Sequence, residues 1–204
     1  MKLTLITQLT LDGVYQGLGG RDEDNRGGFA HGGWSVPYGD EEFLSFVHEL
    51  VGRLDGLLLG RRTYEIFAGY WPKVSGDPVS DRFNSRPKYV ASTTLATPSW
   101  DGTSVIGRED LAKDVAALKE QPGRELQIHG SGEVARHLLA HDLVDTLHVV
   151  TFPVVLGSGL RLFGEGGLPT AFRTTASRLT SSGVVITSYE SAGRPTYGNY
   201  GLDA

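Results

Sequence analysis

The sequence predicts an α/β domain whose sheet is mainly parallel and carries an antiparallel edge. Strand-like apolar runs alternate with helix-like runs up to residue 152, which is typical of parallel βα units. The last two runs, 171–181 and 184–190, alternate in polarity and are joined by Ser182-Gly183 like a terminal hairpin. A chain of 204 residues is long enough for one domain and short for two. We therefore expect a single domain over residues 1–204.

The first expected strand runs from Lys2 to Leu11 and ends at the turn signal Asp12-Gly13. A glycine-rich loop follows at 13–34, and we expect it to be mobile. Apolar residues then recur at helical spacing over 41–53, behind an acidic first turn. The remaining elements of this half are a strand at 57–60, a helix at 61–68, and strands at 88–92 and 103–106.

The second half begins with a helix at 109–120, which Pro122-Gly123 ends. After it we expect a strand at 124–129, a glycine turn, a helix at 132–141 and a strand at 145–152. The tail at 191–204 has no periodicity, and we expect it to pack as irregular structure.

Composition excludes several classes of function. The net charge of −5 gives no basic footprint, so nucleic acid is not an expected partner. The chain has no cysteine, which excludes disulfides and thiolate metal sites. The start is too polar for a signal peptide, and no apolar run is long enough to span a membrane. We therefore expect a cytoplasmic protein without membrane contact.

The turn at 130–135 reads G-S-G-E-V-A and fits the pattern G-x-G-x-x-G/A between a strand and a helix. Glycines let the backbone approach an anion, and the free N–H groups of a helix start attract negative charge. A Rossmann fingerprint also needs an acid about 20 residues later, but 149–152 reads V-V-T-F. A Rossmann domain is therefore disfavoured. The turn is either a phosphate cradle or a tight corner in which Ser131 caps the helix.

Two other strand ends favour the phosphate interpretation. Arg61 and Arg62 open a helix, where cations oppose the helix dipole by about 0.3–1 kcal/mol each unless an anion binds. Ser92, Thr93 and Thr94 place three hydroxyls after another strand. Ligands of open α/β sheets bind at the carboxyl ends of strands. Three such ends fit a dinucleotide that carries an extra phosphate.

Several segments together resemble a known family. They are LTLDG, LLLGRRTYEIF, YVASTTL, LQIHGSGEVARHLL, DLVDTLHVVTFPVVLGSGLRLF and TSSGVVITSYE. In order and spacing the chain resembles the dihydrofolate reductase-like family. The branch it is most similar to contains the reductase domain of the bifunctional deaminase-reductase of riboflavin biosynthesis. The resemblance implies a three-layer fold around an eight-stranded, mostly parallel sheet, NADPH as the hydride donor and a homodimer.

The resemblance also implies roles for particular residues. Those matched to the helix start at the cofactor phosphates are Gly60, Arg61, Arg62 and Thr63. Ser92 and Thr93 match the hydroxyls around the 2′-phosphate, beside Thr94. Those matched to the turn beneath the pyrophosphate are His129, Gly130, Ser131, Gly132, Glu133 and Val134. Asp12 and Gly13 match the loop near the nicotinamide and the substrate.

Hydride transfer also needs a proton source, for which Asp12 and Asp40 are the candidates and water is the rival. Asp12 is equally interpreted as a turn residue, and Asp40 as a helix N-cap. Four aromatic residues have two interpretations, a wall that faces the substrate or ordinary packing. They are Trp34, Tyr38, Tyr70 and Trp71.

Glu133, His137 and His141 share one helix face, but nothing distant completes a metal site, so we expect no metal. The deaminase signature needs cysteines, so the deaminase half is absent.

The expected function is that of an NADPH-dependent reductase acting on a small heterocyclic or ribosylamino-pyrimidine-like substrate. The resembling activity is that of a 5-amino-6-(5-phosphoribosylamino)uracil reductase. A pterin or dihydrofolate-type reductase on the same fold is one alternative. A non-catalytic module that binds NADPH is the other.

Overall fold

A computed structural model describes residues 1–107, 109–164 and 166–201. The strands are β1 (Lys2–Thr10), β2 (Leu54–Gly60), β3 (Lys88–Ala91), β4 (Thr103–Ile106), β5 (Glu125–His129), β6 (Thr146–Phe152), β7 (Phe172–Leu179) and β8 (Val185–Ser191). The helices are α1 (Glu41–Gly52), α2 (Arg61–Tyr70), α3 (Pro78–Ser85), α4 (Leu111–Lys119) and α5 (Gly132–Ala140). Single 3-10 turns lie at η1 (Arg26–Gly28), η2 (Val36–Tyr38) and η3 (Trp71–Lys73).

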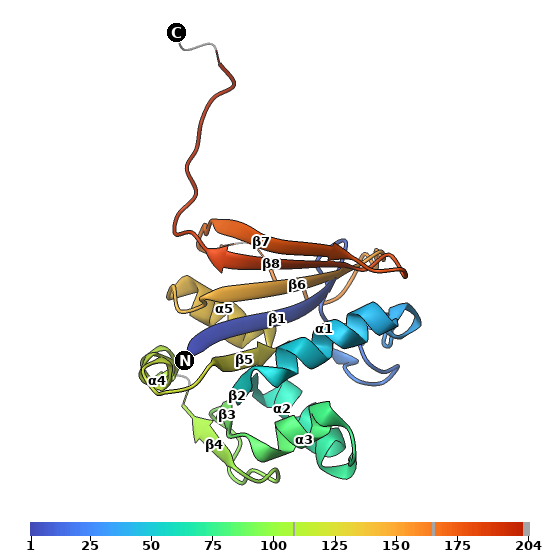
Figure 1. The fold of residues 1–204 in the computed structure, drawn as a ribbon, viewed down its shortest axis with the longest axis vertical. Coiled ribbons are helices and arrows are strands. Elements are labelled where there is room, and N and C mark those ends of the chain that lie inside the picture. The colour runs from blue at the N-terminus through green and yellow to red at the C-terminus, as the bar shows by residue number, and fades with distance from the viewer. Residues whose placement is uncertain (108, 165, 202–204) are drawn as a thin grey trace.

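The eight strands form one sheet in the order β4-β3-β2-β5-β1-β6-β8-β7. The pairs from β4 to β6 are parallel, and β8 joins β6 antiparallel with β7 on its outer side. Figure 1 shows this sheet with helices on both faces. The predicted fold class, a mostly parallel mixed sheet with an antiparallel C-terminal edge, is confirmed.

Strand alternation divides the core into two sides of the sheet. Leu5, Leu58 and Ile128 point to one side, where they pack with buried residues of α4 and α5. Ile6 and its neighbours on β6 and β8 point to the other side and pack against α1, while α2 and α3 cover β2 and β3 there. Among the described residues, no helix is both long and apolar enough to cross a bilayer.

One helix, α3, was not expected from the sequence. It has eight residues and lies in a segment without a clear apolar period. Its start does carry a signal, because the Asp77 carboxylate accepts hydrogen bonds from the backbone N–H groups of Val79 and Ser80, and Pro78 occupies the first helical turn.

The glycine-rich loop at 13–34 packs against the body of the protein, unlike the mobile loop expected from its composition. Val14, Phe29 and Trp34 are buried in the cluster under α1. The Trp34 indole Nε1 donates a 2.8 Å hydrogen bond to the Gln16 carbonyl. Apolar side chains spaced along the loop therefore anchor it, and its glycines shape its turns.

The expectation that the C-terminal tail packs is wrong for most of its described part. Arg194 makes a bidentate ion pair with Asp142. Beyond this anchor the chain extends away from the sheet (Figure 1), and Tyr197 is 83% exposed. The segment has too few apolar side chains to offset the entropy of ordering it.

His148 on β6 is a buried titratable group under α1. Its ring centroid lies 5.7 Å from that of Phe46, and Nδ1 is 2.8 Å from the Ser188 hydroxyl. Nε2 has no hydrogen-bond partner within the described structure, and the residue is only 6% exposed. Burial, aided by the nearby Arg53, lowers the pKa of His148 to about 4.

We predict that His148 makes the fold acid-sensitive. Between pH 6.5 and about pH 4 the unfolded chain binds a proton at this position and the folded chain does not. Acidification through this window should therefore lower the free energy of unfolding by roughly 2–3 kcal/mol through this residue. Urea titrations of wild type and His148→Asn at pH 7 and pH 4.5 measure the effect. An equally steep loss in His148→Asn would contradict it, and His48→Asn on the exposed face of α1 is the control.

Candidate functional site

Three neighbouring strands end at the same edge of the sheet, and each carboxyl end carries one of the predicted polar segments. β3 leads to Ser92, β2 leads directly into α2 at Arg61, and β5 leads through Gly130 into α5. The order β3-β2-β5 is continuous in the sheet. The amino-terminal ends of α2 and α5 therefore converge, and both present free N–H groups to the same space.

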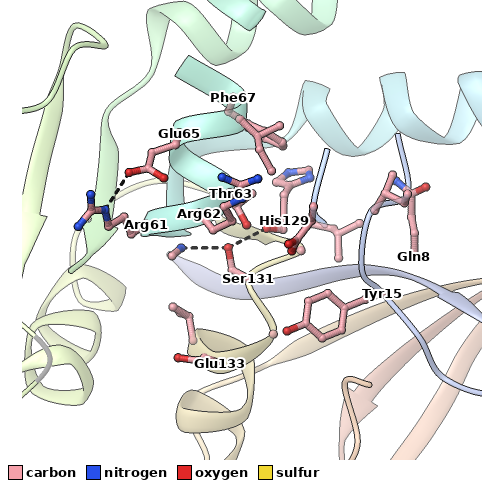
Figure 2. Close-up of a pocket in the computed structure, with 18 of the residues that line it drawn as sticks. Gln8, Tyr15, Arg61, Arg62, Thr63, Glu65, Phe67, His129, Ser131 and Glu133 are labelled. Carbon is pink, nitrogen blue, oxygen red and sulfur yellow. Dashed lines mark hydrogen bonds and ion pairs between the residues drawn. The ribbon is translucent and has the colours of Figure 1, made fainter. Parts of the chain in front are cut away.

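Ser131 joins these two helix starts. Its hydroxyl Oγ accepts a 2.9 Å hydrogen bond from the Gly60 N–H and donates a 3.0 Å bond to the His129 carbonyl (Figure 2). Its backbone is left-handed, with φ of 52°, which is costly for a residue with a Cβ. The side chain makes no capping bond to α5. Ser131 is therefore a bridge between β2 and β5 and not the helix cap of the tight-corner interpretation.

The two glycines of the turn answer different constraints, close approach at Gly132 and a left-handed backbone at Gly130. A Cβ on Gly132 would lie 2.4 Å from Cζ of Tyr15, so a larger residue there would require the Tyr15 ring to move. Gly130 adopts a φ of 56°, and a Cβ there would lie 3.6 Å from Oγ1 of Thr63 on α2. The backbone of the turn is thus held against both the loop and the neighbouring helix.

Arginines surround the two helix starts. Arg61 pairs with Glu65 at 2.8 Å and donates to the Thr94 hydroxyl. Arg62 donates a 2.7 Å hydrogen bond to the Glu23 carbonyl. Both arginines are exposed, and Figure 2 shows them with Thr63 at the start of α2.

A third arginine was not expected from the sequence. Arg26 makes two hydrogen bonds to the Asp24 carboxylate and interacts electrostatically with Glu133 at the start of α5. It lies in the glycine-rich loop, 35 positions before Arg61, and no local motif marks it.

These groups line one cavity of about 620 Å³. We call its polar part the phosphate end; its lining includes Gly60, Arg61, Arg62, Thr63, Ser92, Thr93, Thr94, Gly130, Ser131, Gly132, Glu133 and Val134. Tyr15, Glu23, Asp24, Arg26, Glu65 and His137 contribute further polar side chains to the lining.

The rest of the cavity lies between α1 and the sheet, and we call it the apolar compartment. Its lining from the helices is Phe43, Phe46, Val47, Leu50, Val51, Ile66, Phe67, Trp71, Val79 and Phe83. Its lining from the strands is Ile6, Gln8, His129 and Val150.

The residues predicted to bind the cofactor therefore meet in one place. All thirteen of them line the cavity, and so does Trp71 of the aromatic candidates. The lining within the described structure does not include Asp12, Gly13, Trp34, Tyr38, Asp40 or Tyr70.

Asp12 is held in a set of structural contacts. Its carboxylate accepts hydrogen bonds from the Thr10 hydroxyl and from the N–H groups of Leu156 and Gly157, and it pairs with Arg161. These bonds, that of Thr10 first, hold the pKa of Asp12 far below its usual range.

Asp40 is the N-cap of α1, the second of its two interpretations. Its carboxylate accepts from the Phe43 N–H at 2.8 Å and from the Ser182 N–H at 3.0 Å. The Phe43 bond contributes most to lowering the pKa of Asp40. Asp40 thereby ties the start of α1 to the β7–β8 turn.

The other aromatic candidates pack elsewhere. Trp34 and Tyr38 meet the Phe152 ring edge-on, with centroids 5.3 and 6.0 Å away. The Tyr70 ring is mostly exposed and rests against Trp71.

The side chain of His129 lies on the wall of the apolar compartment, although its backbone belongs to the glycine turn. Its ring centroid is 5.3 Å from that of Phe83 and 6.2 Å from that of Phe67. Burial lowers the pKa of His129 to about 4, so the ring is neutral at pH 7.

A hydrogen-bond network assigns the tautomer of this neutral ring. The Gln127 Nε2 donates to the Leu50 carbonyl and to Glu125, which orients its Oε1 as the acceptor 3.1 Å from His129 Nε2. Nε2 therefore carries the proton, and Nδ1 is left as an acceptor.

Gln8 is the other polar group of the apolar compartment, and sequence analysis did not single it out. It lies two residues after Ile6 on β1, so both point to the α1 side. Its side-chain amide makes no hydrogen bond within the described structure. A glutamine in an otherwise apolar and threonine-rich strand was the available signal.

Comparisons with known proteins agree with this architecture. The model of one protein family, RibD C-terminal domain, matches residues 1–186. An uncharacterized Bacillus subtilis protein, YyaP, is 26% identical over 189 residues, covering 90% of this chain and 92% of YyaP. A second one, YwjB, is 27% identical over 127 residues, covering 62% of this chain and 66% of YwjB.

Solved structures share the fold. A Shewanella sp. PV-4 protein described as a candidate riboflavin biosynthesis protein has a TM-score of 0.64 at 24% identity, covering 94% of this chain and 99% of its own. A pyrimidine reductase-like protein of Corynebacterium diphtheriae has a TM-score of 0.60 at 15% identity, with 93% and 91% covered. Dihydrofolate reductase of Enterococcus faecalis, solved with NADP(H) and RAB-propyl, has a TM-score of 0.60 at 16% identity, with 94% and 96% covered.

We predict that the Ser131 bridge contributes measurably to stability. Ser131→Ala removes both hydrogen bonds, keeps the strained φ and should lower the free energy of unfolding by about 1–3 kcal/mol. Ser131→Gly removes the same bonds but relieves about 1 kcal/mol of left-handed strain, so its loss should be smaller. Urea denaturation of the three proteins decides the matter. A Gly variant less stable than the Ala variant would contradict the strain argument, and a wild-type value for Ser131→Ala would contradict the bridge.

Proposed function

Because the chain belongs to the RibD C-terminal domain family, we propose that it is an NADPH-dependent reductase of small heterocyclic substrates. The expected substrates are ribosylamino-pyrimidine-like compounds of the kind handled in riboflavin biosynthesis. The observation that carries the proposal is the convergence of two helix starts, three arginines and three hydroxyls on one cavity.

The residues present fit a dinucleotide phosphate. The free N–H groups at the starts of α2 and α5 are available as donors for a pyrophosphate. Arg61 and Arg62, with the hydroxyls of 92–94, are the groups for a 2′-phosphate. When bound, NADPH supplies the hydride. The chain's own part is to hold the phosphates, orient the ring and exclude water.

The negative charge of Glu133 disfavours the binding of an anion at the start of α5. This residue lies in the first turn of α5, where its own charge already interacts favourably with the helix dipole. Arg26 lies close enough to interact with it electrostatically. The lining also holds Glu23, Asp24 and Glu65, of which Asp24 pairs with Arg26 and Glu65 with Arg61. An anion here would therefore be held mainly by the free N–H groups of the two helix starts and by Arg62.

Two alternatives use the same cavity. A pterin or dihydrofolate-type reductase would share the phosphate end and differ in the apolar compartment. A non-catalytic module would bind NADPH without turnover. Titration of the purified protein with NADPH and NADH, followed by NADPH oxidation assays, separates these: binding without oxidation of any heterocycle favours the module.

We propose a homodimer from the resemblance and from exposed apolar side chains in one segment of the chain. Val155, Leu160, Phe163 and Leu168 are exposed in the segment before β7, and β7 is an uncovered edge strand. Such apolar groups are candidates for burial between two copies, which light scattering on the purified protein tests.

We predict that Arg62 selects the 2′-phosphate. Arg62→Ala should weaken NADPH binding by about tenfold or more, since a charge-assisted contact is lost, and should leave NADH binding nearly unchanged. Calorimetric titration with both nucleotides measures this. Equal losses for NADPH and NADH would refute the assignment. Lys113→Ala, an exposed cation on α4 across the sheet, is the matched control.

The hypothesis that Asp12 is the proton source has its own test. If it is, Asp12→Asn should keep NADPH affinity and lose about a hundredfold or more in turnover. Unchanged turnover would remove Asp12 from the chemistry and leave water as the donor. A joint loss of stability and cofactor affinity would instead indicate that the contacts with Arg161 and the 156–157 turn are its role.

A further inference from the structure

The cavity is divided by charge, and this division bears on the substrate. Its charged lining residues either belong to the starts of α2 and α5 or interact with them. Arg62 bonds to the Glu23 carbonyl, and Arg26 interacts with Glu133. In the described lining, α1, α3 and the sheet contribute no charged side chain to the apolar compartment.

Aromatic rings make up much of the lining of this compartment. Phe67 stacks on Phe83 with centroids 5.7 Å apart, and Trp71 meets the Phe83 ring edge-on at 5.0 Å. Phe43, Phe46 and Leu50 of α1 also line the compartment, in one packed cluster with Ile6. A slot between aromatic rings and aliphatic side chains favours a planar ring system.

Two neutral polar groups face this slot from neighbouring strands, as Figure 2 shows for Gln8 and His129. The Gln8 amide offers a donor and an acceptor, and His129 offers Nδ1 as an acceptor, since Nε2 is bonded to Gln127. A neutral donor and acceptor pair matches the N–H and C=O of a cyclic amide.

We propose that the substrate of this reductase is an uncharged planar heterocycle with a cyclic-amide edge and without a phosphate or other anionic group. The inference rests on the proposed function. With the dinucleotide at the phosphate end, the arginines are engaged, and a second phosphate would enter an apolar space. Burying such an anion without a partner costs several kcal/mol. Gln8 and His129 are then binding residues for the ring edge.

A matched pair of probes tests this: 5-amino-6-ribosylaminouracil and its 5′-phosphate, which differ only in the phosphate. Their affinities are measured by calorimetry on protein saturated with NADP⁺, and kcat/KM is measured by NADPH oxidation. We expect the phosphate-free compound to be favoured at least tenfold in both. Equal affinities, a preference for the phosphate, or no binding of the phosphate-free compound would each overturn the proposal.

A variant of Gln8 tests where the heterocyclic ring of the substrate binds. Gln8→Leu should weaken the phosphate-free probe at least tenfold and leave NADPH affinity within twofold, which also shows that the variant is folded. Gln121→Leu, an exposed position, is the control. Undiminished probe binding in Gln8→Leu would remove Gln8 from the site. If wild type does not bind NADPH at all, the proposed function fails; if it binds NADPH and prefers the phosphate, only this inference fails.

Discussion

The hydroxyl of Ser131 holds the amino-terminal ends of two helices together, and the geometry of the site depends on that bridge. β2 and β5 are parallel neighbours, so α2 and α5 begin side by side at the same edge of the sheet. The bond from Gly60 N–H to Ser131 Oγ fixes their separation. The left-handed backbone at Ser131 then aims the free N–H groups of α5 into the cavity. Strain at this residue is balanced by two part-buried hydrogen bonds, an arrangement typical of functional turns.

From this bridge the cavity extends in two chemically different directions. Toward α2 and β3 it meets arginines and hydroxyls, which suit a multiply charged ligand. Toward α1 it meets aromatic and aliphatic side chains, among which Gln8 and His129 are neutral polar groups. In the proposed function, a charged cofactor and an uncharged substrate would occupy these adjacent parts of the cavity. The glycine-rich loop packs over the two helix starts. The Tyr15 ring lies on Gly132, and the Glu23 carbonyl accepts a hydrogen bond from Arg62.

Sequence reasoning located the phosphate end and did not locate the apolar compartment. Motifs such as 60–63 and 129–134 are contiguous, and the rule for strand ends in parallel sheets brings them together without coordinates. The walls of the compartment come from α1, α2 and α3, and their apolar residues look like any core-facing helix stripe. Asp12 follows β1 and Asp40 precedes α1, so both were reasonable candidates for this edge of the sheet. Local hydrogen bonds nevertheless hold both carboxylates outside the cavity lining.

The sequence by itself determined the class of fold, the order of strands and helices outside α3, and the three polar strand ends, because each depends on local periodicity or turn chemistry. Only the tertiary structure decided which side chains meet. Arg26, Gln8 and His129 enter the cavity from a loop and two strands that are separated in the chain by up to 121 positions. Their encounter follows from strand pairing and from the packing of the loop, which bring distant residues into contact in a way that no local pattern specifies.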